Sequence, residues 1–416
     1  MSLLRQVLID AAEDAARRDR FPVGASLEFA DLEDAGREEA LDRLRAVEPI
    51  SWIPALGGWL ATGYAEARQT LSPRAGLTVE AEENLVRASL GTMMLTTDAD
   101  DHARLRVPFE RPFRMREVGE RFGCAIATEV DDLLDAIAPL GRCELGAAFA
   151  APYAVRMTGR VLGLSLDDVA RIDGFYTAFA GAMVYDGNPE PQQLADAARE
   201  ELNLILHGEL ARCRREPDAS VTSQVANDGE VNLTDDEIAA QLRVTMFGGI
   251  ETVQSAIMNT ILLLLRDPNQ LEAVRVDSEL LPNAIEESMR LIPPVAFIER
   301  WTPHPSEIGG VEIGVGEFVG ASVLAANRDP AMFEDPLRYD VRRQNARRHL
   351  AFSFGRHYCL GAHLARIEIA GAVRRLLEAL PGLRLVGCEE PAGFAFRRPA
   401  TLELAWESAK IPILPA

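Results

Sequence analysis

Apolar residues recur at helical spacing through much of the first half of the 416-residue chain. The pattern is clearest over Ala40 to Val47, Val118 to Ala136 and Leu194 to Arg212, and it predicts an amphipathic helix in each segment. The stretch from Arg215 to Val231 is polar and has no comparable period. It is the most loop-like segment of the chain and predicts a connection between helices.

A much longer helix is predicted directly after this connection. Thr234 and Glu237 have the spacing of a capping box, in which each side chain binds the backbone N–H group of the other residue. Apolar residues continue to Leu265, and Asp267-Pro268 then ends the pattern. A helix of roughly 30 residues is about 45 Å long, so it would cross the whole domain.

Three segments predict short strands instead of helices. Runs from Glu307 to Val323 alternate between apolar and polar residues and are divided by glycines, which indicates small hairpins, and Phe394 to Trp406 alternates similarly. The β-richer parts are expected at about 48–72, 296–324 and 383–407. Since neither a repeat nor a flexible linker interrupts the chain, we expect one mainly α domain over residues 1–416 with a minor β region.

The charge balance narrows the classes of function. Lysine and arginine total 43 and aspartate and glutamate total 64, giving a formal net charge of −21. Nucleic acid is therefore an improbable partner, because phosphate contacts need a basic face, and an anionic membrane surface offers no attraction. The first residues have no apolar signal-peptide core, and no strictly apolar run approaches the roughly 20 residues that span a bilayer. We expect a cytoplasmic, soluble protein.

One of the five cysteines stands in an unusual loop. Four of them, Cys124, Cys143, Cys213 and Cys388, are scattered without a C-x-x-C pair, so they indicate neither a disulfide framework nor a zinc site. Cys359 lies between Gly355 and Gly361 and just before a predicted helix, whose N-terminus would favour a thiolate. By itself such a cysteine fits a core residue, a nucleophile or a haem ligand.

Three other patterns carry chemistry, and each has a plainer structural explanation. Glu287 and Arg290 share one helical face and could pair, although a solvated surface pair has the same spacing. The middle of the long helix contains Gly248, Gly249, Glu251 and Thr252. The Thr252 hydroxyl can donate to the carbonyl of Gly248, four residues earlier, and bend the helix. A kink that serves only packing would have the same pattern. His102 and Arg106 share a face that could equally be solvated.

The string F-x-x-G-x-x-x-C-x-G, followed by A-x-L-A-R, resembles the haem-binding loop of the cytochrome P-450 superfamily. The segment from Ala325 to Pro330 is similar to the soluble bacterial branch of that family. The fixed positions here are Phe352, Gly355, Cys359 and Gly361, whereas Ser353 stands where the family usually has a second glycine. The resemblance implies a single cytochrome P-450-like domain with its long central helix over haem b. It also implies that Cys359 is the axial ligand of the haem iron.

The resemblance assigns expected roles to the other patterns. Gly248, Glu251 and Thr252 would lie on the oxygen side, with Thr252 orienting dioxygen and Glu251 connecting to solvent protons. Glu287 and Arg290 would form a structural ion network with Arg338, from the loop Pro336 to Tyr339. The expected haem-propionate ligands are His102, Arg106, Arg300 and His357. The expected substrate-pocket walls, for which ordinary core packing is an equal alternative, are the loop from Met93 to Thr97 with Leu95, Phe247, the segment from Val295 to Phe297, and the segment from Phe394 to Phe396.

The resemblance also implies a reaction: insertion of one oxygen atom from O2 into a small, mostly apolar organic molecule. Electrons would come from NAD(P)H through a separate soluble ferredoxin. An arginine-rich segment before the cysteine loop could dock an acidic ferredoxin, or it could be only a solvated loop; its arginines are Arg342, Arg343, Arg347, Arg348 and Arg356. Three other readings remain: a peroxide-using variant, a haem-based sensor, and a cysteine hydrolase.

Overall fold

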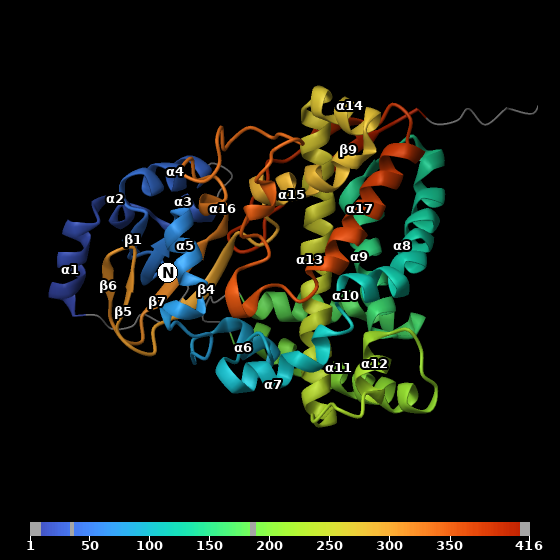
Figure 1. The fold of residues 1–416 in the computed structure, drawn as a ribbon, viewed down its shortest axis with the longest axis horizontal. Coiled ribbons are helices and arrows are strands. Elements are labelled where there is room, and N and C mark those ends of the chain that lie inside the picture. Colours follow the sequence, from blue (N-terminus) through green and yellow to red (C-terminus); the bar gives the residue numbers. More distant parts are fainter. Residues whose placement is uncertain (1–9, 34–36, 184–188, 408–416) are drawn as a thin grey trace, which may run out of the picture.

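The computed structural model of the chain describes residues 10–33, 37–183 and 189–407 (Figure 1). The expectation about the first residues therefore falls partly on residues 1–9, outside the described ranges. The longer helices are α1 (Ala11–Arg20), α4 (Arg37–Val47), α7 (Ala99–Glu110), α8 (Met115–Ile137), α9 (Ala151–Leu162), α10 (Leu166–Ala182), α11 (Glu190–Arg215), α13 (Asp235–Arg266), α14 (Pro268–Val276), α15 (Leu281–Leu291) and α17 (Ala362–Ala379). The shorter ones are α2 (Pro22–Ala25), α3 (Phe29–Glu33), α5 (Tyr64–Thr70), α6 (Leu85–Leu90), α12 (Val221–Asn227) and α16 (Val323–Ala326).

Helix α13 is the longest of the described helices. The predicted capping box begins it, with the Thr234 hydroxyl accepting from the Glu237 N–H group at 3.2 Å and the Glu237 carboxylate accepting from the Thr234 N–H group at 2.9 Å. The helix has 32 residues and packs against α9, α11, α15 and α17. By length and composition it could span a membrane, but 78% of its most apolar 18-residue stretch is buried inside the protein, which is typical of a core helix.

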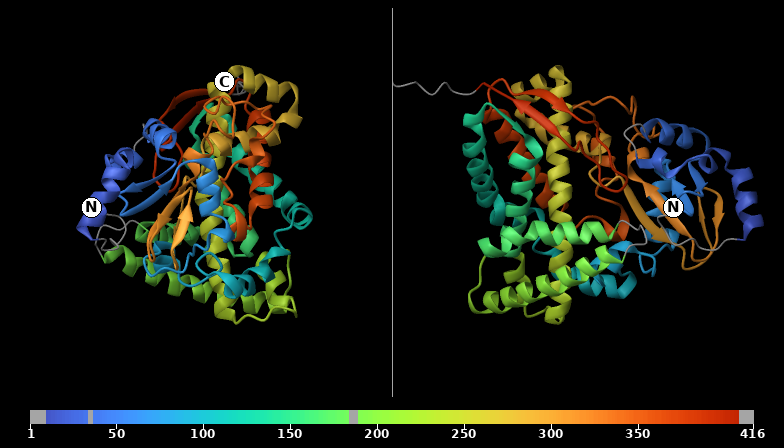
Figure 2. Two further views of the ribbon diagram at one scale, coloured as in Figure 1. Left: turned by 60° about the vertical axis from the view of Figure 1, so that its left-hand side comes forward. Right: turned by 180° about the vertical axis from the view of Figure 1, so that it is seen from behind.

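The other predicted helices are confirmed within α4, α8 and α11. Figures 1 and 2 show α8 to α13 and α17 gathered into one helical body. The expectation that residues 215–231 are the most loop-like segment is met only in part, since α12 forms there with Ser220 as its N-cap. Val221 and Val225 are buried one turn apart, and two apolar residues are too few to reveal a period in the sequence.

The strands of the described residues form three small sheets. The first sheet has the order β1 (Ile50–Ile53), β2 (Gly58–Ala61), β7 (Phe318–Ser322) and β4 (Phe297–Trp301), and only its β2–β7 pair is parallel. A hairpin joins β5 (Ser306–Ile308) to β6 (Val311–Ile313), as the glycine-divided pattern predicts. The third sheet has the order β3 (Arg142–Glu144), β9 (Leu402–Ala405) and β8 (Arg384–Cys388). Strand β3 has too short an alternation to be predicted.

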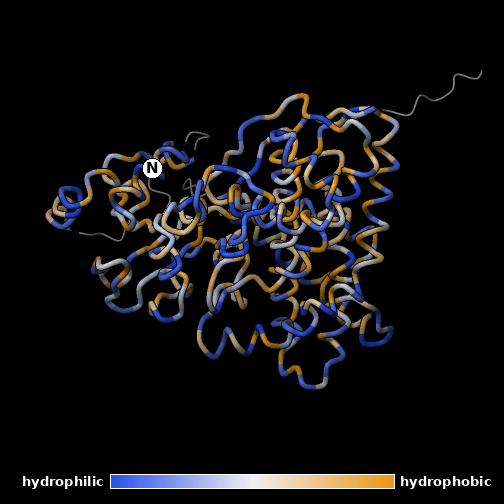
Figure 3. The backbone as a smooth tube through the Cα atoms, turned by 45° about the horizontal axis from the view of Figure 1, so that its top comes forward, coloured by the Kyte–Doolittle hydropathy of each residue, from blue (hydrophilic) through white to orange (hydrophobic). Residues whose placement is uncertain are grey.

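The first sheet and the helices α1 to α5 lie together beside the helical body (Figure 1). In Figure 3 hydrophobic and hydrophilic stretches alternate along most helices, as expected for elements that bury one face. A long segment of loops and short turns leads from α16 to α17. It contains the cysteine loop, so the loop lies between the sheet side and the helical body.

Candidate functional site

The cysteine loop is closed by short-range backbone hydrogen bonds. The Cys359 N–H group donates to the Phe352 carbonyl at 2.9 Å, and the Tyr358 N–H group donates to the Gly355 carbonyl at 3.2 Å. Helix α17 begins three residues after the cysteine, with Gly361 as its N-cap. Burial raises the pKa of the Cys359 thiol, while the Gly361 N–H group and the cations of Arg106 and Arg366 lower it in part. These contributions only partly offset the effect of burial, so the pKa of the thiol stays above its ordinary value.

Two positions of the loop have backbone conformations that favour glycine. Gly355 has a φ of +77°, and a Cβ atom there would lie 2.7 Å from Pro73 Cδ and 2.8 Å from the Leu71 carbonyl oxygen. Glycine is therefore needed both for the turn and for close approach to the sheet side. Ser353, where the resemblance expects glycine, has a φ of +63°, and its buried hydroxyl has no hydrogen-bond partner.

A side-chain hydrogen bond spans one turn in the middle of helix α13, next to Gly248. The Thr252 hydroxyl donates to the Gly248 carbonyl at 2.5 Å, which confirms the predicted bond. A Cβ atom at Gly249 would lie 2.9 Å from the Thr158 hydroxyl of α9, so this glycine permits close helix packing. A Cβ atom at Gly248 would meet nothing within 4 Å, and Gly248 is exposed while the rest of α13 from Ile238 to Leu264 is buried or half-buried. The Gly248 side of α13 therefore faces open space.

Glu251 lies beside Thr252 but its carboxylate is already engaged. It accepts from Arg398 Nε at 2.8 Å and from the Ser255 hydroxyl at 3.1 Å, and the Tyr176 hydroxyl lies 3.5 Å from its second oxygen. Arg398 belongs to the loop between β8 and β9, and Tyr176 belongs to α10. Neither residue was singled out by the sequence, since no local pattern connects them with Glu251.

The four predicted propionate ligands come from three separate segments. His102 and Arg106 lie on α7, Arg300 on β4 and His357 in the cysteine loop. The rings of His102 and His357 are 4.5 Å apart, and Arg106 donates to the Tyr358 carbonyl at 2.8 Å. His102 Nε2 and Arg300 Nη2 are buried without a hydrogen-bond partner. Burial, with nearby His357 and Arg106, lowers the pKa of His102 to about 4, so the ring is neutral at pH 7.

An acid that the sequence analysis missed sits among these groups. Asp98, the residue before α7, accepts from His357 Nε2 at 2.9 Å and from the Thr78 hydroxyl at 2.8 Å. Burial alone would raise its pKa, but the hydrogen bonds from His357, Val79 and Thr78 hold the pKa well below its usual range. Asp98, Arg300, Arg356 and His357 line a cavity of about 290 Å³. In the sequence, Asp98 stands four residues, about one helical turn, before His102, and this spacing could have identified Asp98 as a neighbour of the expected propionate ligands.

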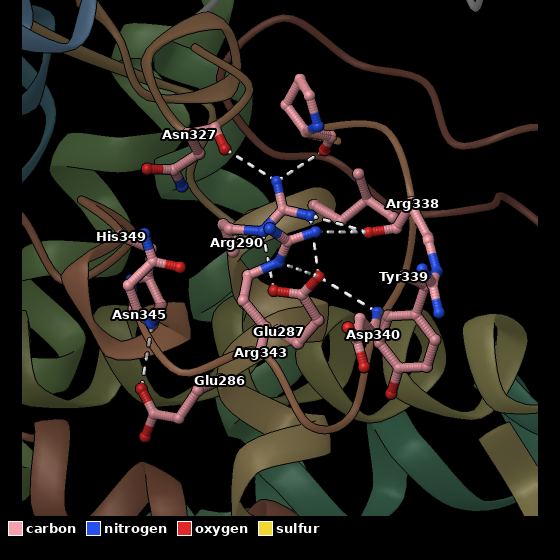
Figure 4. A network of polar contacts seen from close by, with 12 residues as sticks. Glu286, Glu287, Arg290, Asn327, Arg338, Tyr339, Asp340, Arg343, Asn345 and His349 are labelled. Atoms are coloured by element: carbon pink, nitrogen blue, oxygen red, sulfur yellow. Dashed lines mark hydrogen bonds and ion pairs between the residues drawn. The ribbon is translucent and has the colours of Figure 1, made fainter. Parts of the chain in front are cut away.

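The ion pair predicted between Glu287 and Arg290 forms and is fully buried (Figure 4). Arg290 Nε and Nη2 donate to the two carboxylate oxygens at 2.7 and 2.8 Å. Arg290 Nη1 donates to the carbonyls of Asn327 and Pro336 at 2.9 and 2.7 Å. The pair therefore ties α15 to the long loop segment that precedes the cysteine.

The prediction of Arg338 as the third side chain of this network is wrong. Its side chain is exposed, and only its carbonyl takes part, accepting from Arg290 and Arg343 at 3.2 and 3.1 Å. The third side chain is Arg343, which is buried and donates to Glu287 from Nε at 2.8 Å. A turn places Arg343 inward while Arg338 points to solvent, as Figure 4 illustrates. Arg343 therefore does not belong to the exposed arginine surface, whereas Arg342, Arg347 and Arg348 are exposed.

A second buried network supports the cysteine loop from α17. Glu286 accepts from His349 Nε2 at 3.0 Å and from Arg366 Nε at 2.5 Å. Burial alone would raise the pKa of Glu286, but the hydrogen bonds and charges of His349 and Arg366 lower it to about 2. The Arg366 guanidinium lies 4.4 Å from the Phe352 ring centroid, a cation–π contact. The ring of Phe352, the residue before Ser353, is therefore held by the Arg366 cation, and the Glu286 carboxylate balances the charge of that cation.

The predicted pocket residues divide into two groups. Phe247 packs in the core of the helical body, where its ring stacks on Tyr176 at 5.3 Å and meets Phe396 at 6.2 Å. Phe396 pairs through its backbone with Val295. Phe297 and Phe394 instead pack on each other at 4.5 Å in the core beside the first sheet. Leu95 is 39% exposed.

This division revises the expected pocket. Side chains two residues apart share a face only within a regular strand. Strand β4 begins at Phe297, so Val295 lies outside it and does not have to face the same side as Phe297. Of the expected wall from Phe394 to Phe396, Phe396 lies beside Phe247, whereas Phe394 packs on Phe297.

The chain is similar to known proteins of one family. The family model described as Cytochrome P450 matches residues 209–380. Cytochrome P450 107B1 of Saccharopolyspora erythraea is 36% identical over 378 residues, which cover 86% of this chain and 89% of that protein. The 6-deoxyerythronolide B hydroxylase of the same organism is 34% identical, covering 82% and 88%. A crystal structure of P450BioI in complex with an acyl carrier protein ligated to hexadec-9Z-enoic acid superposes with a TM-score of 0.82 at 28% identity, covering 89% and 98%.

Proposed function

The chain belongs to the cytochrome P450 family and is a monooxygenase, and on that basis we propose that it binds haem b through the Cys359 thiolate. Haem b supplies the iron at which O2 is reduced and one oxygen atom is transferred to the substrate. The donor set suits such a group. Cys359 offers a soft sulfur ligand in a tight loop, and the Gly248 side of α13 faces open space.

The groups proposed to hold the haem propionates fit carboxylates. His102 Nε2 and Arg300 Nη2 are buried nitrogens without a hydrogen-bond partner among the described residues, and a buried polar group of this kind is costly unless a bound group satisfies it. Arg106 and His357 add two further groups beside the cysteine. Asp98 lies among these groups and holds His357 in place.

We assign proton delivery to Thr252 and Glu251. The Thr252 hydroxyl is held by the Gly248 carbonyl and can exchange that bond for one to a neighbouring water or oxygen atom. Glu251 can pass protons toward it from the Arg398 side. An adjacent acid and alcohol suit proton transfer in a reduction that consumes protons, and such groups typically contribute 10²–10⁴-fold to a rate.

For the substrate we propose a small, mostly apolar organic molecule that packs beside Phe247, Phe396 and Val295. Tyr176 adds an aromatic face with one hydroxyl. The hydroxylase of a macrolide precursor and the structure with a fatty acyl chain, both among the similar proteins, support macrolactones and long-chain fatty acids as first candidates. Optical titration with a panel of such compounds would rank them by displacement of the iron-bound water.

We propose that NAD(P)H supplies the electrons through a soluble ferredoxin in the cytoplasm. The exposed arginines Arg342, Arg347 and Arg348 precede the cysteine loop, and no ion pair among the described residues neutralises them. In a chain of net charge −21, this local positive surface would attract an acidic ferredoxin while the remaining surface repels it.

The observation that carries the proposal is the Cys359 loop, and its test is spectroscopic. Cys359→Ser should abolish the carbon monoxide difference spectrum typical of thiolate ligation and abolish oxygenation. Cys124→Ser, an exposed cysteine on α8, is the matched control and should keep both. A thiolate spectrum that survives Cys359→Ser would show that another residue is the ligand.

The assignment of Thr252 has its own matched control. Thr252→Ala should retain haem while NADPH oxidation with surrogate redox partners yields more peroxide and less product. Thr260→Ala removes a bond of the same kind, from hydroxyl to the carbonyl four residues earlier at 2.7 Å, two turns along α13, and should leave coupling unchanged. Equal coupling in parent and Thr252→Ala proteins would contradict the assignment. It would also favour a haem sensor, which needs no proton delivery.

A further inference from the structure

Three buried arginines lie together where α4 meets the loop between β8 and β9 and the end of α16. Arg37 is 3% exposed, Arg397 is 0% exposed and Arg328 is 8% exposed, and Arg37 feels the charges of the other two. Among the described residues a single acid forms ion pairs with them: Glu38 accepts from Arg397 Nη2 and lies 3.5 Å from Arg328 Nη2. Three cations and one carboxylate leave a buried excess of positive charge.

The guanidinium groups of Arg37 and Arg397 are neighbours. Arg37 Nη1 donates at 3.1 Å to the carbonyl of Phe394, three residues before Arg397. Arg397 in turn donates to Glu38, the residue after Arg37, so each arginine reaches the segment that carries the other. Burial, together with repulsion from Arg397, lowers the pKa of Arg37 to about 9, which still leaves Arg37 a cation at pH 7.

These two side chains also have nitrogens that nothing satisfies. Arg37 uses Nη1 for the carbonyls of Leu32 and Phe394, and Arg397 uses Nη2 for Glu38. Arg37 Nε and both Nε and Nη1 of Arg397 are buried without a hydrogen-bond partner among the described residues. A buried N–H group without an acceptor is costly, and more so when it belongs to a cation. The cluster therefore lacks an acceptor that also carries negative charge.

The space beside Arg37 limits the size of this acceptor. A cavity of about 10 Å³ borders Arg37, and its other lining residues include Leu41, Phe297, Ser322 and Phe394. A cavity needs roughly 10–15 Å³ to hold one water molecule, so an organic carboxylate, a sulfate or a phosphate is too large. Water would satisfy N–H groups but leave the charge unbalanced, whereas a monoatomic anion of similar size does both.

We propose that Arg37 and Arg397 bind one small inorganic monoanion of the size of chloride. The anion joins α4, which lies beside the helical body, to the loop that carries Phe396 and Arg398 (Figure 1). It stabilises the junction between these two parts of the molecule. Its binding requires neither haem nor substrate, so it is independent of the proposed reaction.

The test measures Tm of the haem-loaded protein in sodium chloride and in sodium gluconate at equal ionic strength, because gluconate is too large for the cavity. With chloride at about 20 times its dissociation constant, Tm should be higher by about 2 °C than in gluconate. Arg37→Gln removes one of the two cations and should abolish this gain. Glu38→Gln removes the competing acid from Arg397 and should lower the chloride concentration at half effect by about threefold to tenfold.

Two further variants are controls for the loss of a charge. Arg17 is a mostly buried arginine of α1 that Glu13 and Glu317 already neutralise, so Arg17→Gln should change Tm equally in both salts. Asp34, an acid outside the described residues, stands three positions before Arg37. Asp34→Asn should keep the parent's gain in chloride if Asp34 is not the counterion.

The position of the anion is tested by diffraction. Bromide is a heavier monoatomic anion that can replace chloride and is visible by its anomalous scattering. Crystals of the haem-loaded protein soaked in bromide should show anomalous density within hydrogen-bond distance of Arg37 Nε and of Arg397. The density should be missing in Arg37→Gln and present in Arg17→Gln.

Each result bears on the proposal. An equal Tm of the parent in chloride and gluconate, or an equal gain in the parent and Arg37→Gln, would overturn it. A gain that appears only in Asp34→Asn would show that the chain supplies its own anion, which overturns it as well. Bromide density without a chloride-dependent Tm would mean an adventitious ion only. If Arg37→Gln does not fold, an unchanged half-effect concentration in Glu38→Gln would count against the site.

Discussion

Ser353 shows how one side chain can be strained by its place in a loop. Its φ of +63° is unfavourable for a residue with a Cβ atom, by roughly 1–2 kcal/mol, and its hydroxyl is buried without a partner. Replacing Ser353 by glycine would remove these costs, but glycine loses more conformational entropy on folding, which offsets part of the gain in stability. We expect Ser353→Gly to raise the free energy of unfolding by about 1 kcal/mol, measured by urea denaturation of the haem-loaded protein.

Ser353→Ala separates the two contributions. It removes the hydroxyl but keeps the strained backbone, so its stability should lie between those of the parent and Ser353→Gly. Ser306→Gly, in the regular strand β5, should lower stability instead. A Ser353→Gly protein less stable than the parent would mean that the hydroxyl has a partner in solution.

Glu368 gives a prediction about pH. It is 5% exposed on α17, and burial raises its pKa from 4.5 to about 8. The folded protein therefore keeps a proton that the unfolded chain releases, so the stability of the fold falls as pH rises from 4.5 to about 8. Glu368→Gln removes this dependence. At pH 8 it should raise stability by an amount on the order of 3 kcal/mol, and the gain in Tm over the parent should be smallest at pH 5.

The exposed Glu378 on the same helix is the comparison. Glu378→Gln should change Tm by a similar small amount at both pH values, because its ion pair with Arg375 is exposed. If the difference in Tm between Glu368→Gln and the parent is the same at pH 5 and pH 8, Glu368 is ionised in the folded protein.

At the scale of elements, the Glu287 network joins α15 to the long segment before the cysteine loop. Arg343 and Arg338 are five residues apart, yet only the first places its guanidinium on Glu287. Removing one member of a buried ion network leaves an unpaired charge and typically costs about 3–5 kcal/mol, whereas exposed substitutions usually stay within about 0.5 kcal/mol. Arg343→Ala should therefore be severely destabilised and Arg338→Ala should resemble the parent in chemical denaturation and in haem retention. Equal losses in both variants would contradict the network.

At the scale of the whole molecule, charge placement predicts how electrons arrive. If Arg347 and Arg348 attract an acidic ferredoxin, the rate of reduction should fall as ionic strength rises, because screening weakens long-range attraction. Arg347→Glu combined with Arg348→Glu should weaken ferredoxin affinity and leave optical titration of panel compounds unchanged.

The control for this prediction reverses the same amount of charge elsewhere. Arg142→Glu combined with Arg384→Glu alters two exposed arginines of the β3–β9–β8 sheet and should reduce affinity much less. Reduction that is independent of salt, or equally fast in both reversed proteins, would show that the donor docks on another surface.

The sequence alone determined the features that depend on neighbours a few residues apart. Thr234 and Glu237 set the start of α13, and the spacing of Gly355, Cys359 and Gly361 specified the cysteine loop. Glu287 and Arg290 were predicted to pair, and Thr252 to bond back to Gly248, because one helical turn brings each pair together. The resemblance added the family and hence the expected fold.

Only the tertiary structure decided which distant side chains meet. Arg343 rather than Arg338 reaches Glu287, because a turn between them sends the two side chains to opposite sides. Asp98 reaches His357 across 259 positions, and Arg398 reaches Glu251 across 147. Phe394 and Phe396 are separated between two cores by the packing of one loop. Periodicity and capping act within a turn or two, whereas these contacts depend on how whole elements pack, which no short stretch of sequence encodes.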